Sequence, residues 1–428
     1  MCRVPKPCPL KKSESPVRSV DEHVAKAVAL VKPLPFAKVT LADALGLVLA
    51  EAVTAQVDSP PFSNSAMDGF AALWTDVEHA TTRAPVTLRV TGESVAGSEN
   101  APTVTPGCAV RVMTGAPVPD GAELVIPVEA TSATFAMFKP VDTDGASVQI
   151  FDAPTGRTHI RRRGEDVVAG QVVMQPGVLL GPSQLAAAAS VGASRLCVIR
   201  RPVVAILATG DELVAPGEPL RPGQIYDSNS VVLAASVRRA GGIPQVLTRV
   251  GDTAEGLLAA LEGAHADLIV TSGGVSAGVY DVVKGALAER GVTFVKVAMQ
   301  PGKPQGLGKL RLGTHDETPI ACLPGNPVSS LVSFEVIVAP MVRVLRGLPP
   351  HRPLESVIVA QGWATPPERQ QYMPVRFHPD GSVVPATGGG SGSHFVASLA
   401  LAEGLAVVPA DVDSVREGDT VELIRISG

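Results

Sequence analysis

From Arg201 onward, short apolar runs alternate with segments that have the spacing of amphipathic helices. Val203–Ala208 is a continuous apolar run, as expected for a parallel strand buried on both faces. Asp227 or Ser228 can cap a helix that continues through Arg239 and stops at Gly241-Gly242. Elements that alternate at this length predict an α/β domain with a doubly wound parallel sheet and right-handed crossovers. Further strands are predicted at 245–250, 268–271, 292–297 and 319–323. Asp252 and Glu255 mark the start of one further helix, and another is predicted over 282–290.

A long helix is predicted directly after the last of these strands. Asn326 is a suitable N-cap, and Pro327 occupies the first helical position, where a missing N–H costs little. Pro340 should kink the helix, and Gly347 followed by Pro349-Pro350 should end it. The apolar face is formed by Leu331, Phe334, Val338, Val342 and Leu345.

The rest of the chain predicts small β domains with a few helices. Ser19 and Glu22 have capping-box spacing at the start of a helix, and Thr40–Leu49 is a second helical segment. Short Val- and Thr-rich runs between turns predict mostly β structure from Val53 to Arg195. The same pattern predicts a small β domain or barrel from Arg352 to Gly428. Within the first β region, 171–178 is predicted as a strand pair and 183–190 as a helix.

Composition excludes several classes of protein. The chain has 428 residues, which by the usual length prior corresponds to roughly three domains. A net charge of -5 argues against a nucleic-acid binder, since phosphate binding needs clustered Lys and Arg. The one basic run, Arg161-Arg162-Arg163, precedes Glu165 and Asp166, which favours a local salt-bridged patch; a small-anion site is the alternative.

The five cysteines and eight histidines show no metal-ligand spacing. An odd cysteine count without a Cys-x-x-Cys pair predicts neither a disulfide framework nor a zinc site, and it favours a reducing, cytoplasmic setting. The first residues are rich in Pro and Lys and are predicted to be a disordered tail, not a signal peptide. No uninterrupted apolar run has the length of a membrane span, so no membrane association is predicted.

Four loops with polar residues should meet at one edge of the predicted sheet, because ligands bind outside the carboxyl ends of parallel strands. Gly-rich turns and helix N-termini bind anionic oxygens, whereas clustered carboxylates need a hard cation such as Mg²⁺ between them and a phosphate. A phosphoanhydride with Mg²⁺ is therefore the predicted class of ligand. The four loops are Thr209–Glu212, Gly251-Asp252, Ser272–Gly278 leading to Asp281, and Leu323–Ser329.

Each of these features also has a purely structural explanation. Ser272-Gly273-Gly274 can be a flexible turn, Asp252 and Asp281 can be helix caps, and Lys303 can be a solvated lysine on a stiff Pro-Gly loop. Rossmann and Walker-type phosphate sites have no support, since the chain has no Gly-x-Gly-x-x-Gly in a strand–helix context and no Gly-Lys-Ser/Thr. The functional interpretation rests on the loops lying together.

Taken in order, the motifs resemble those of the MoeA and gephyrin E-domain family of molybdopterin molybdenumtransferases. The resemblance covers nearly all of the chain after the tail and includes the four loops above. It is carried further by Phe62–Phe70 (FSNSAMDGF), Arg111–Pro119 (RVMTGAPVP), Ile160–Asp166 (IRRRGED), Gly223–Asn229 (GQIYDSN) and Pro301–Pro304 (PGKP).

The resemblance implies a multidomain α/β protein. The implied parts are a tail at 1–18, an N-terminal and linker region at 19–200 with an inserted, mostly β domain at about 54–155, a molybdopterin-binding α/β domain at 201–348, and a C-terminal small β-barrel at 350–428. It also implies a homodimer, with a pterin adenylyltransferase as the upstream partner. The implied reaction inserts molybdenum from molybdate into adenylyl-molybdopterin, releases AMP and depends on Mg²⁺.

The resemblance also assigns site residues, position by position. The implied catalytic residues are Asp68, Thr114, Asp166, Glu212, Asp252 and Asp281, of which Glu212, Asp252 and Asp281 are the implied Mg²⁺ ligands. The implied pterin and oxyanion contacts are Ser272, Gly273, Gly274, Ser276, Lys296, Lys303, Pro324, Gly325, Asn326, Ser329 and Arg369, with the Ser391-Gly392-Ser393 loop beside them.

Two positions depart from the family pattern. Gln300 stands where many members have a second lysine, which removes one positive charge, and Phe70 replaces the usual tyrosine. Two other functions remain open on the sequence alone: pterin adenylylation, which is the preceding step, and a non-catalytic scaffold of the gephyrin kind.

Overall fold

The computed structural model describes residues 17–99, 102–133, 146–249, 251, 253–275, 282–311, 317–386 and 397–427. The predicted tail lies almost wholly outside these ranges. The chain forms two compact units. Unit 1 consists of Met1–Ala37, Gly46–Val48 and Val198–Gly428, and unit 2 of Lys38–Leu45 and Leu49–Cys197.

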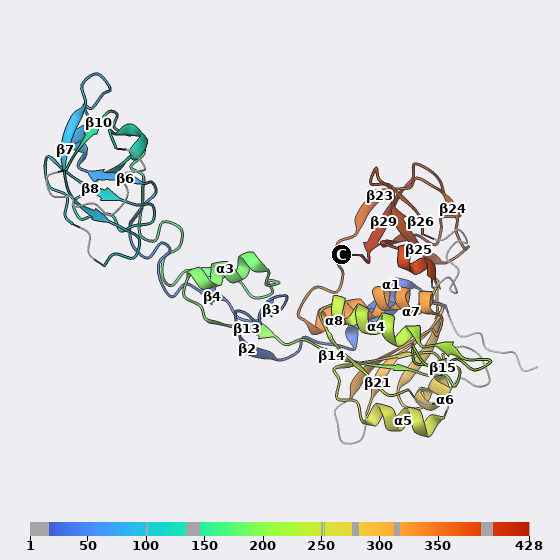
Figure 1. Cartoon of the computed structure of the whole chain (residues 1–428). Coiled ribbons are helices and arrows are strands. Elements are labelled where there is room, and N and C mark those ends of the chain that lie inside the picture. The colour runs from blue at the N-terminus through green and yellow to red at the C-terminus, as the bar shows by residue number, and fades with distance from the viewer. Residues whose placement is uncertain are drawn as a thin grey trace, which may run out of the picture. The chain divides into compact units, whose positions relative to one another are not determined.

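The centre of unit 1 is a seven-stranded sheet in the order β1-β19-β21-β22-β18-β14-β17 (Figure 1). β14 pairs in parallel with both β17 and β18, and β18 pairs in parallel with β22, so the predicted α/β domain with its parallel strands is confirmed. β21 was not predicted, and it runs antiparallel to β19 and β22. Its Gly306 and Gly308 interrupt the apolar pattern that would have marked a strand. The strands are β1 (Val17–Arg18), β14 (Val203–Ala208), β17 (Ile243–Val246), β18 (Leu268–Ser272), β19 (Val292–Val297), β21 (Pro304–Leu310) and β22 (Thr318–Leu323).

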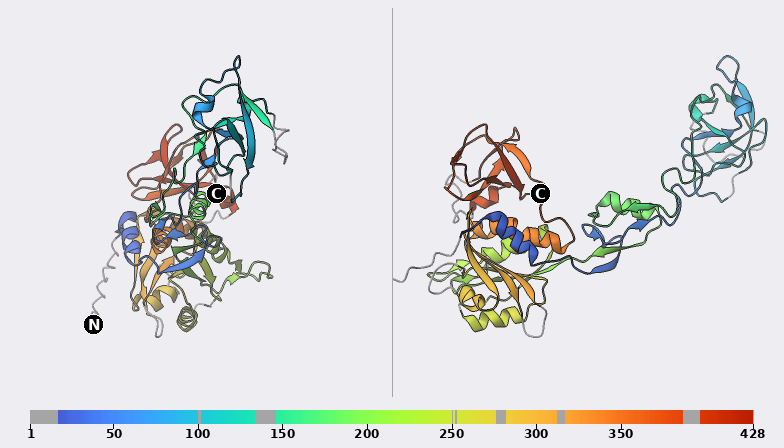
Figure 2. Two further views of the ribbon diagram at one scale, coloured as in Figure 1. Left: turned by 90° about the vertical axis from the view of Figure 1, so that its left-hand side faces the viewer. Right: turned by 180° about the vertical axis from the view of Figure 1, so that it is seen from behind.

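Helices cover both faces of this sheet. Figure 1 and the rear view in Figure 2 show α5 (Ala254–Glu262) and α6 (Val282–Ala288) on one face. α1 (Val20–Ala29), α4 (Ser228–Arg239) and the helix after β22 lie on the other. Each face has its own buried apolar cluster, and strand residues alternate between the two: Val204 and Ile206 face one cluster, Ala205 and Leu207 the other.

The predicted helix after β22 is continuous over Pro327–Leu345 but changes its winding. It consists of α7 (Pro327–Ser333), a π-helical turn η3 (Phe334–Val338) and α8 (Ala339–Leu345). Pro340 therefore lies in the first turn of α8, where its missing N–H is tolerated. Gly347 has φ +76° and ends the helix, as predicted.

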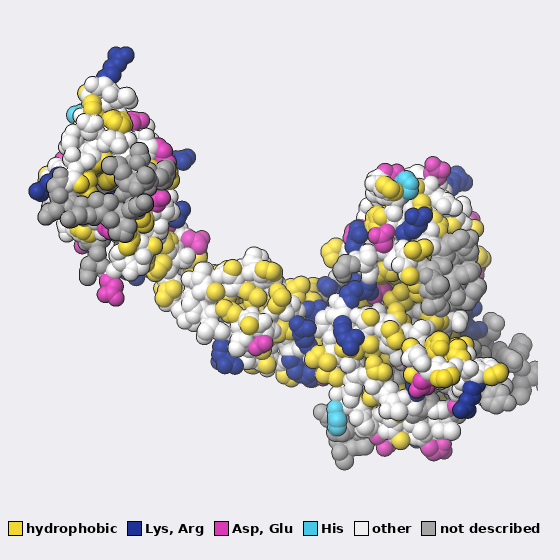
Figure 3. Space-filling view, in the orientation of Figure 1, with side chains coloured by type: hydrophobic (Ala, Val, Ile, Leu, Met, Phe, Trp, Pro, Cys, Tyr) yellow, Lys and Arg dark blue, Asp and Glu magenta, His cyan; other side chains and the backbone are white. Residues whose placement is uncertain are grey.

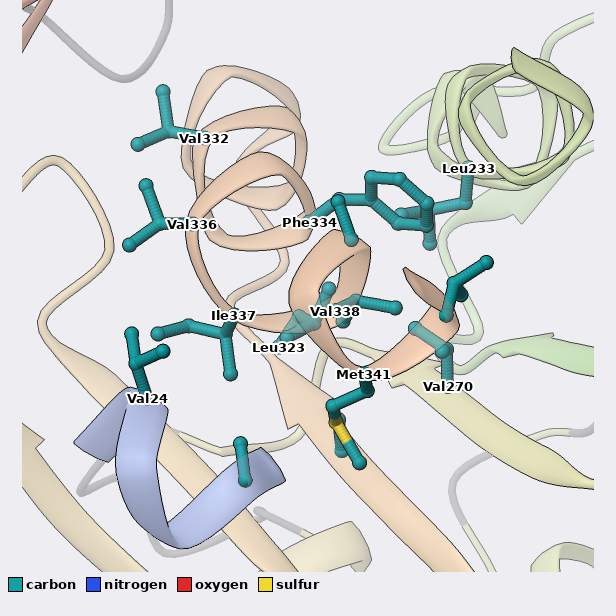
Figure 4. Close-up of a cluster of buried hydrophobic side chains, with 14 of the residues drawn as sticks. Val24, Leu233, Val270, Leu323, Val332, Phe334, Val336, Ile337, Val338 and Met341 are labelled. Carbon is teal, nitrogen blue, oxygen red and sulfur yellow. The ribbon is translucent and has the colours of Figure 1, made fainter. Parts of the chain in front are cut away.

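This 19-residue helix is long and apolar enough to cross a membrane, but 83% of its apolar window is buried inside the protein. Figure 4 shows why. Phe334 points toward Leu233 of α4, Ile337 lies beside Val24 of α1, and Val338 and Met341 lie over the sheet strands that carry Val270 and Leu323. The helix is therefore a central part of the buried cluster on this face of the sheet.

Local capping explains where several helices begin. Ser19 Oγ accepts from Glu22 N at the start of α1, and Asp227 accepts from Ser230 N at the start of α4, both as predicted. α5 is capped by Thr253 through Gly256 N. Asp252 lies outside the described residues, so Thr253 is the cap that the structure shows.

The structure tests three sequence predictions in the N-terminal half. The predicted helix over Thr40–Leu49 is wrong: Thr40 ends strand β2 (Phe36–Thr40), and the chain reaches β3 (Val48–Leu49) through turns. Thr40 Oγ1 donates to Asp43 Oδ2 at 2.7 Å, a local bond that competes with helix formation. The segment 171–178 holds one strand, β12 (Val172–Met174), whose partner is β4 (Val53–Thr54). α3 (Pro182–Ser190) forms as predicted.

Unit 2 is mostly β, as predicted. Its main sheet has the order β10-β7-β8-β6-β9 and carries apolar clusters on both faces. β7 and β8 pair in parallel, and the other neighbours are antiparallel. The elements are β5 (Asn64–Ser65), β6 (Gly69–Ala72), α2 (Trp74–Val77), β7 (Val86–Ser94), β8 (Cys108–Val112), β9 (Leu124–Pro127), η1 (Val128–Ala130), β10 (Ser147–Ile150), β11 (Ile160–Arg161) and β13 (Arg195–Ile199), the last extending into unit 1.

The C-terminal part of unit 1 is a second β structure, again as predicted. Its sheet has the order β20-β25-β27-β29-β23, with β26 paired to β25. β20 (Met299–Gln300) comes from the α/β segment and pairs in parallel with Gln370-Gln371 of β25. The remaining elements are β23 (Glu355–Ile358), β24 (Trp363–Ala364), β25 (Gln370–Phe377), β26 (Val383–Pro385), η4 (Ala397–Leu401), β27 (Gly404–Val408), β28 (Ser414–Val415) and β29 (Thr420–Arg425).

A buried ion cluster joins α4, η3 and the segment that leads to β23. The Glu335 side chain is 1% exposed and accepts from Arg239 and from Arg352. Arg239 also donates to the carbonyl oxygen of Ile426, close to the end of the second sheet. A buried carboxylate lowers the stability of the fold unless it is fully paired, so Glu335 needs both arginines.

Candidate active site

A cleft of 680 Å³ lies at the carboxyl edge of the parallel strands in unit 1. The ends of β14, β18 and β22 and the loop after β20 supply its walls, as the sequence predicted for a doubly wound sheet. Its lining mixes polar and apolar residues and consists of Thr209, Gly210, Glu212, Leu213, Ile225, Tyr226, Ser228, Asn229, Ser272, Gly273, Gly274, Val275, Gln300, Pro301, Gly302, Lys303, Pro304, Pro324, Gly325, Asn326, Pro327 and Ser329.

Asn229 ties three walls of the cleft together. Its Nδ2 donates to Ser272 Oγ at 2.9 Å and to the carbonyl oxygen of Gly325 at 2.6 Å. Ser272 Oγ in turn lies 3.3 Å from the carbonyl oxygen of Pro324. Asn229 and Ser272 are both buried, so these bonds are shielded from water and fix the loop after β22 against the end of β18.

Two glycines allow the loops to approach each other. Gly273 has φ +101°, and a Cβ there would lie 2.8 Å from the carbonyl oxygen of Thr209. A Cβ on Gly325 would lie 3.3 Å from Gly273 Cα. A larger residue at Gly273 would therefore force apart the loops that form the floor of the cleft.

Two helices begin at the cleft. α4 starts beside Ser228 and Asn229, and the helix of α7 starts at Asn326. At the start of α7, free N–H groups and the positive end of the helix dipole favour an anionic ligand. At the start of α4, the Asp227 carboxylate already accepts from Ser230 N, so this helix end offers less to an anion. Ser329, in the first turn of α7, lines the cleft and is 4% exposed.

The charged side chains of the described lining are Glu212 and Lys303, both exposed. Gln300, the neutral residue in place of the family's second lysine, accepts from Arg369 Nη1 at 2.9 Å. Arg369 is not a lining residue, but this bond holds its positive charge directly behind Gln300. The cleft thus combines one lysine, two helix N-termini and a carboxylate.

An apolar rim borders the polar cleft. β15 (Leu213–Val214) and β16 (Ile225–Tyr226) form a short arm, whose hydrophobic side chains are visible on the surface in Figure 3. Ile225 is 55% and Tyr226 45% exposed, and both line the cleft. Ile225, Tyr226 and Asn229 were not predicted as site residues, although all three lie in the GQIYDSN motif that carries the resemblance.

The structure brings together nine of the predicted site residues in this one cleft: Glu212, Ser272, Gly273, Gly274, Lys303, Pro324, Gly325, Asn326 and Ser329. Lys296 does not line it, because it lies within β19 opposite Pro304 and Val17. Arg369 reaches it through Gln300. Asp252, Ser276, Asp281 and Ser391-Gly392-Ser393 lie outside the described residues.

The three remaining predicted residues belong to unit 2. Asp68 Oδ1 accepts from Thr114 N at 2.6 Å and from Thr114 Oγ1 at 2.8 Å, so these two form a pair. Asp166 Oδ2 lies 3.4 Å from Ser59 Oγ. Asn64 and Ser65 of the same motif as Asp68 are buried and belong to β5.

The predicted salt-bridged patch around the basic run has different partners from those expected. Arg163 pairs with Asp58, while Glu165 accepts from the backbone N of Arg162 at 2.7 Å. The backbone N–H of Ala169, followed by Arg163, lowers the pKa of Asp58 below its usual value. The local turn 162–165 brings Glu165 back to the backbone and leaves Arg163 free to reach Asp58.

Among the described residues, no group of three His, Cys, Asp or Glu side chains is arranged to hold a metal ion. Cys108, Cys197 and Cys322 are free and buried. Burial raises the pKa of the Cys322 thiol to about 12, so this cysteine is an unreactive core residue.

Three family profiles match consecutive parts of the chain. The MoeA N-terminal region (domains I and II) matches residues 18–192, a probable molybdopterin-binding domain matches 205–344, and the MoeA C-terminal region (domain IV) matches 356–426. The fold and the cleft therefore define a multidomain protein with a molybdopterin-binding type of α/β domain.

Whole-length relatives agree. Molybdopterin molybdenumtransferase 2 of Mycobacterium tuberculosis is 43% identical over 421 residues, covering 95% of this chain and 99% of its own. The Haemophilus influenzae molybdopterin molybdenumtransferase is 33% identical, with 92% and 96% covered. A crystal structure of the molybdopterin biosynthesis MoeA protein of Pyrococcus horikosii has a TM-score of 0.78 at 29% identity, covering 96% of this chain and 100% of that one. This chain belongs to the molybdopterin molybdenumtransferase (MoeA) family, whose members are transferases of molybdenum cofactor biosynthesis.

Proposed function

We propose that this protein inserts molybdenum from molybdate into adenylyl-molybdopterin and releases AMP. The observation that carries the proposal is the convergence of three of the four predicted loops on one cleft at the ligand edge of the sheet. The cleft suits an anionic, phosphate-bearing ligand, since the N-terminus of α7 and Lys303 face it. The 43% identical relative is named a molybdopterin molybdenumtransferase.

The phosphoanhydride of the substrate is assigned to the loop edge formed by Ser272–Gly274 and Gly325–Ser329. Backbone N–H groups there can donate hydrogen bonds to the phosphate oxygens on which negative charge develops when the bond to AMP breaks. Lys303 and Ser329 are assigned to molybdate, which must lie beside the dithiolene sulfurs for the metal to be transferred. Holding both substrates in one cleft makes the transfer intramolecular, and no nucleophilic side chain is required.

Mg²⁺ is part of the proposal. The carboxylate of Glu212, which lines the cleft and is exposed, is an oxygen donor of the hard type that Mg²⁺ prefers. Asp252 and Asp281 are the further ligands that the family resemblance assigns. When bound, Mg²⁺ would neutralise charge on the phosphate oxygens.

The further proposals concern assembly and location. We propose a cytoplasmic homodimer that receives its pterin from an adenylyltransferase and has no nucleic-acid or membrane partner. Asp68, Thr114 and Asp166 are assigned to the same reaction by their motifs. Light scattering on the purified protein tests the dimer, and a single-subunit mass at micromolar concentration would contradict it.

The decisive experiment is a product assay. The purified protein is incubated with adenylyl-molybdopterin, molybdate and Mg²⁺, and AMP release is followed by chromatography. AMP release that requires molybdate supports the proposal. Consumption of ATP with unadenylylated pterin would identify the protein as the enzyme of the preceding step. If the protein catalyses neither reaction but binds another protein stably, a scaffold role is favoured.

A further inference from the structure

The loop that carries Lys303 is held on its inner side by the buried side chain of Gln305. Gln305 is 1% exposed, and its Nε2 donates to the carbonyl oxygen of Gly302 at 2.9 Å and to Ser333 Oγ at 3.0 Å. The carbonyl oxygen of Lys303 itself accepts from Val297 N at 2.7 Å. The backbone is thus fixed on both sides of the lysine.

The orientation of the Gln305 amide follows from its partners. A carbonyl oxygen can only accept, so the group that faces Gly302 must be the NH₂. Oε1 of Gln305 therefore points away from the loop. It is buried and has no partner at strict hydrogen-bond geometry among the described residues.

His23 of α1 supplies the complementary group. Its ring is fully buried, and Nδ1 lies 3.1 Å from Arg18 Nη1. Because a guanidinium can only donate, Nδ1 must accept and the ring proton must be on Nε2. Nε2 of His23 and Oε1 of Gln305 are thus a buried donor and a buried acceptor, and neither has a hydrogen-bond partner among the described residues. Burial and then the charge of Arg18 lower the pKa of His23, whereas the Gln305 side chain raises it, as an acceptor beside the ring would.

We propose that Arg18, His23 and Gln305 form a directed hydrogen-bond chain that positions the Lys303 loop for oxyanion binding. Each link has one allowed direction: Arg18 donates to His23, His23 donates to Gln305, and Gln305 donates to Gly302. His23 and Gln305 are positioning residues, since neither lines the cleft. The chain makes oxyanion affinity depend on α1, a helix remote from the loop in sequence.

Gly302 explains why the chain is needed. It has φ +113°, and a Cβ there would lie 2.9 Å from Ser333 Oγ and 3.0 Å from Met299 Cε. A glycine in a loop has many alternative conformations in water, and its carbonyl has to be held for one of them to persist. Gln305 provides that bond, and His23 keeps Gln305 in the required orientation.

The test compares His23→Leu, His23→Gln and Gln305→Leu with wild type. The equilibrium constant for molybdate is measured by titration calorimetry, and KM for molybdate and for adenylyl-molybdopterin are measured separately. His23→Leu and Gln305→Leu should each weaken molybdate binding roughly 5- to 10-fold, the loss expected for one buried hydrogen bond. KM for the pterin substrate should stay within about twofold, because that contact lies on other loops. In His23→Gln the amide replaces both ring nitrogens, so affinity should return to near the wild-type value.

A double-mutant cycle decides whether the two residues act as one chain. The affinity of the His23→Leu/Gln305→Leu double variant for molybdate should be no lower than that of whichever single variant binds molybdate less tightly. Val24→Ala is the matched control: it opens a cavity beside His23 on the same helix, and it should lower stability without changing molybdate affinity. If His23→Leu does not fold, Arg18→Met removes the first link from outside the core and should weaken molybdate binding in the same direction.

The inference rests on the proposed function, and the two can fail separately. Absence of molybdate binding and of AMP release in the wild type would contradict the function. Wild-type binding with unchanged affinity in His23→Leu, additive losses in the double variant, or an equal rise in both KM values would overturn the positioning chain.

Discussion

Nη1 of Arg369 donates a hydrogen bond of 2.9 Å to Oε1 of Gln300. Arg369 lies just before β25 and Gln300 within β20, two strands that are also paired through their backbones. A lysine at position 300 would place two positive charges together, whereas glutamine accepts the arginine without adding charge. With Gln300, the cleft wall lacks the cation that a lysine would supply, but the hydrogen bond to Gln300 fixes Arg369 behind the wall.

Gln300→Glu should strengthen the bond to Arg369 and weaken molybdate binding. The new carboxylate lies in the cleft wall and repels an oxyanion, so KM for molybdate should rise about 3- to 10-fold, as expected for like charges a few ångströms apart under partial solvent screening. Enzyme assays at low and high salt measure this effect. Gln300→Ala is the control, since it removes the acceptor without adding charge; an equal rise in KM in both variants would contradict the electrostatic explanation.

Asn229→Asp should nearly abolish activity. It replaces the amide that donates to Ser272 and to Gly325 with an acceptor that faces the Gly325 carbonyl oxygen. The loops should separate, and a misplacement of about 1 Å costs roughly 100-fold in kcat/KM. The control is Ala235→Ser on the exposed side of α4, which should be neutral. Activity within twofold of wild type in Asn229→Asp would be inconsistent with the bridging role.

Gly273→Ala should destabilise the protein by about 1 to 3 kcal/mol, because a methyl group at φ +101° would collide with the Thr209 carbonyl. Gly285→Ala in α6 is the matched control. A Cβ there meets nothing within 4 Å, so the change should stabilise by up to about 1 kcal/mol. Urea unfolding measures both values, and a shift of the same sign would contradict the argument.

Glu335→Ala should cost about 3 to 5 kcal/mol, since it leaves Arg239 and Arg352 facing a buried site without a carboxylate. Glu355→Ala is the comparison: Glu355 pairs with Arg425 at the surface, where solvent screens the pair, so little or no change is expected. The two proteins are compared by thermal and urea unfolding. Equal losses of unfolding free energy in the two variants would show that burial does not determine how much the ion cluster stabilises the protein.

His23 should make the protein lose stability in mild acid. Burial, followed by the charge of Arg18, lowers the pKa of His23 from 6.5 to about 4. The unfolded chain then binds a proton at higher pH than the folded one, so stability is complete above pH 6.5 and falls as the pH drops from 6.5 toward 4. The loss approaches on the order of 3 kcal/mol. The free energy of unfolding, measured with urea at pH values from 7.5 to 4.5, should fall less steeply with decreasing pH in His23→Gln than in the wild type. The same pH dependence in both proteins would show that His23 is not the cause.

The sequence was sufficient for the architecture of the α/β domain because its signals are local. Apolar runs, the caps Ser19 and Asp227, and Asn326 with Pro327 each specify an element within a few residues. Of the four motif loops predicted to meet at one edge, three line the cleft through their described residues, whereas Gly251 does not line it. β21 was missed because its glycines conceal a buried strand, and the turn at Thr40–Asp43 depends on a side-chain bond that periodicity does not report.

The parts of the site that escaped prediction depend on tertiary partners. The role of Asn229 is defined by Ser272 and Gly325, which lie 43 and 96 positions further along the chain. The environment of His23 likewise depends on Gln305, a residue of the unpredicted β21. Residue type and spacing identify candidates on a loop, but they do not show which buried side chain holds that loop in place.

The pairing of β20 with β25 means that the two sheets of unit 1 are not separable modules. A boundary drawn at Pro349-Pro350 looks like a natural place to cut the chain, yet cutting there would strip Met299 and Gln300 of their backbone partners. The residues left unpaired are the ones that lead into Lys303. An excised α/β domain would retain the Gly-rich loops while losing the external support of its lysine loop, so a minimal version of this enzyme has to include the strand at 370–371.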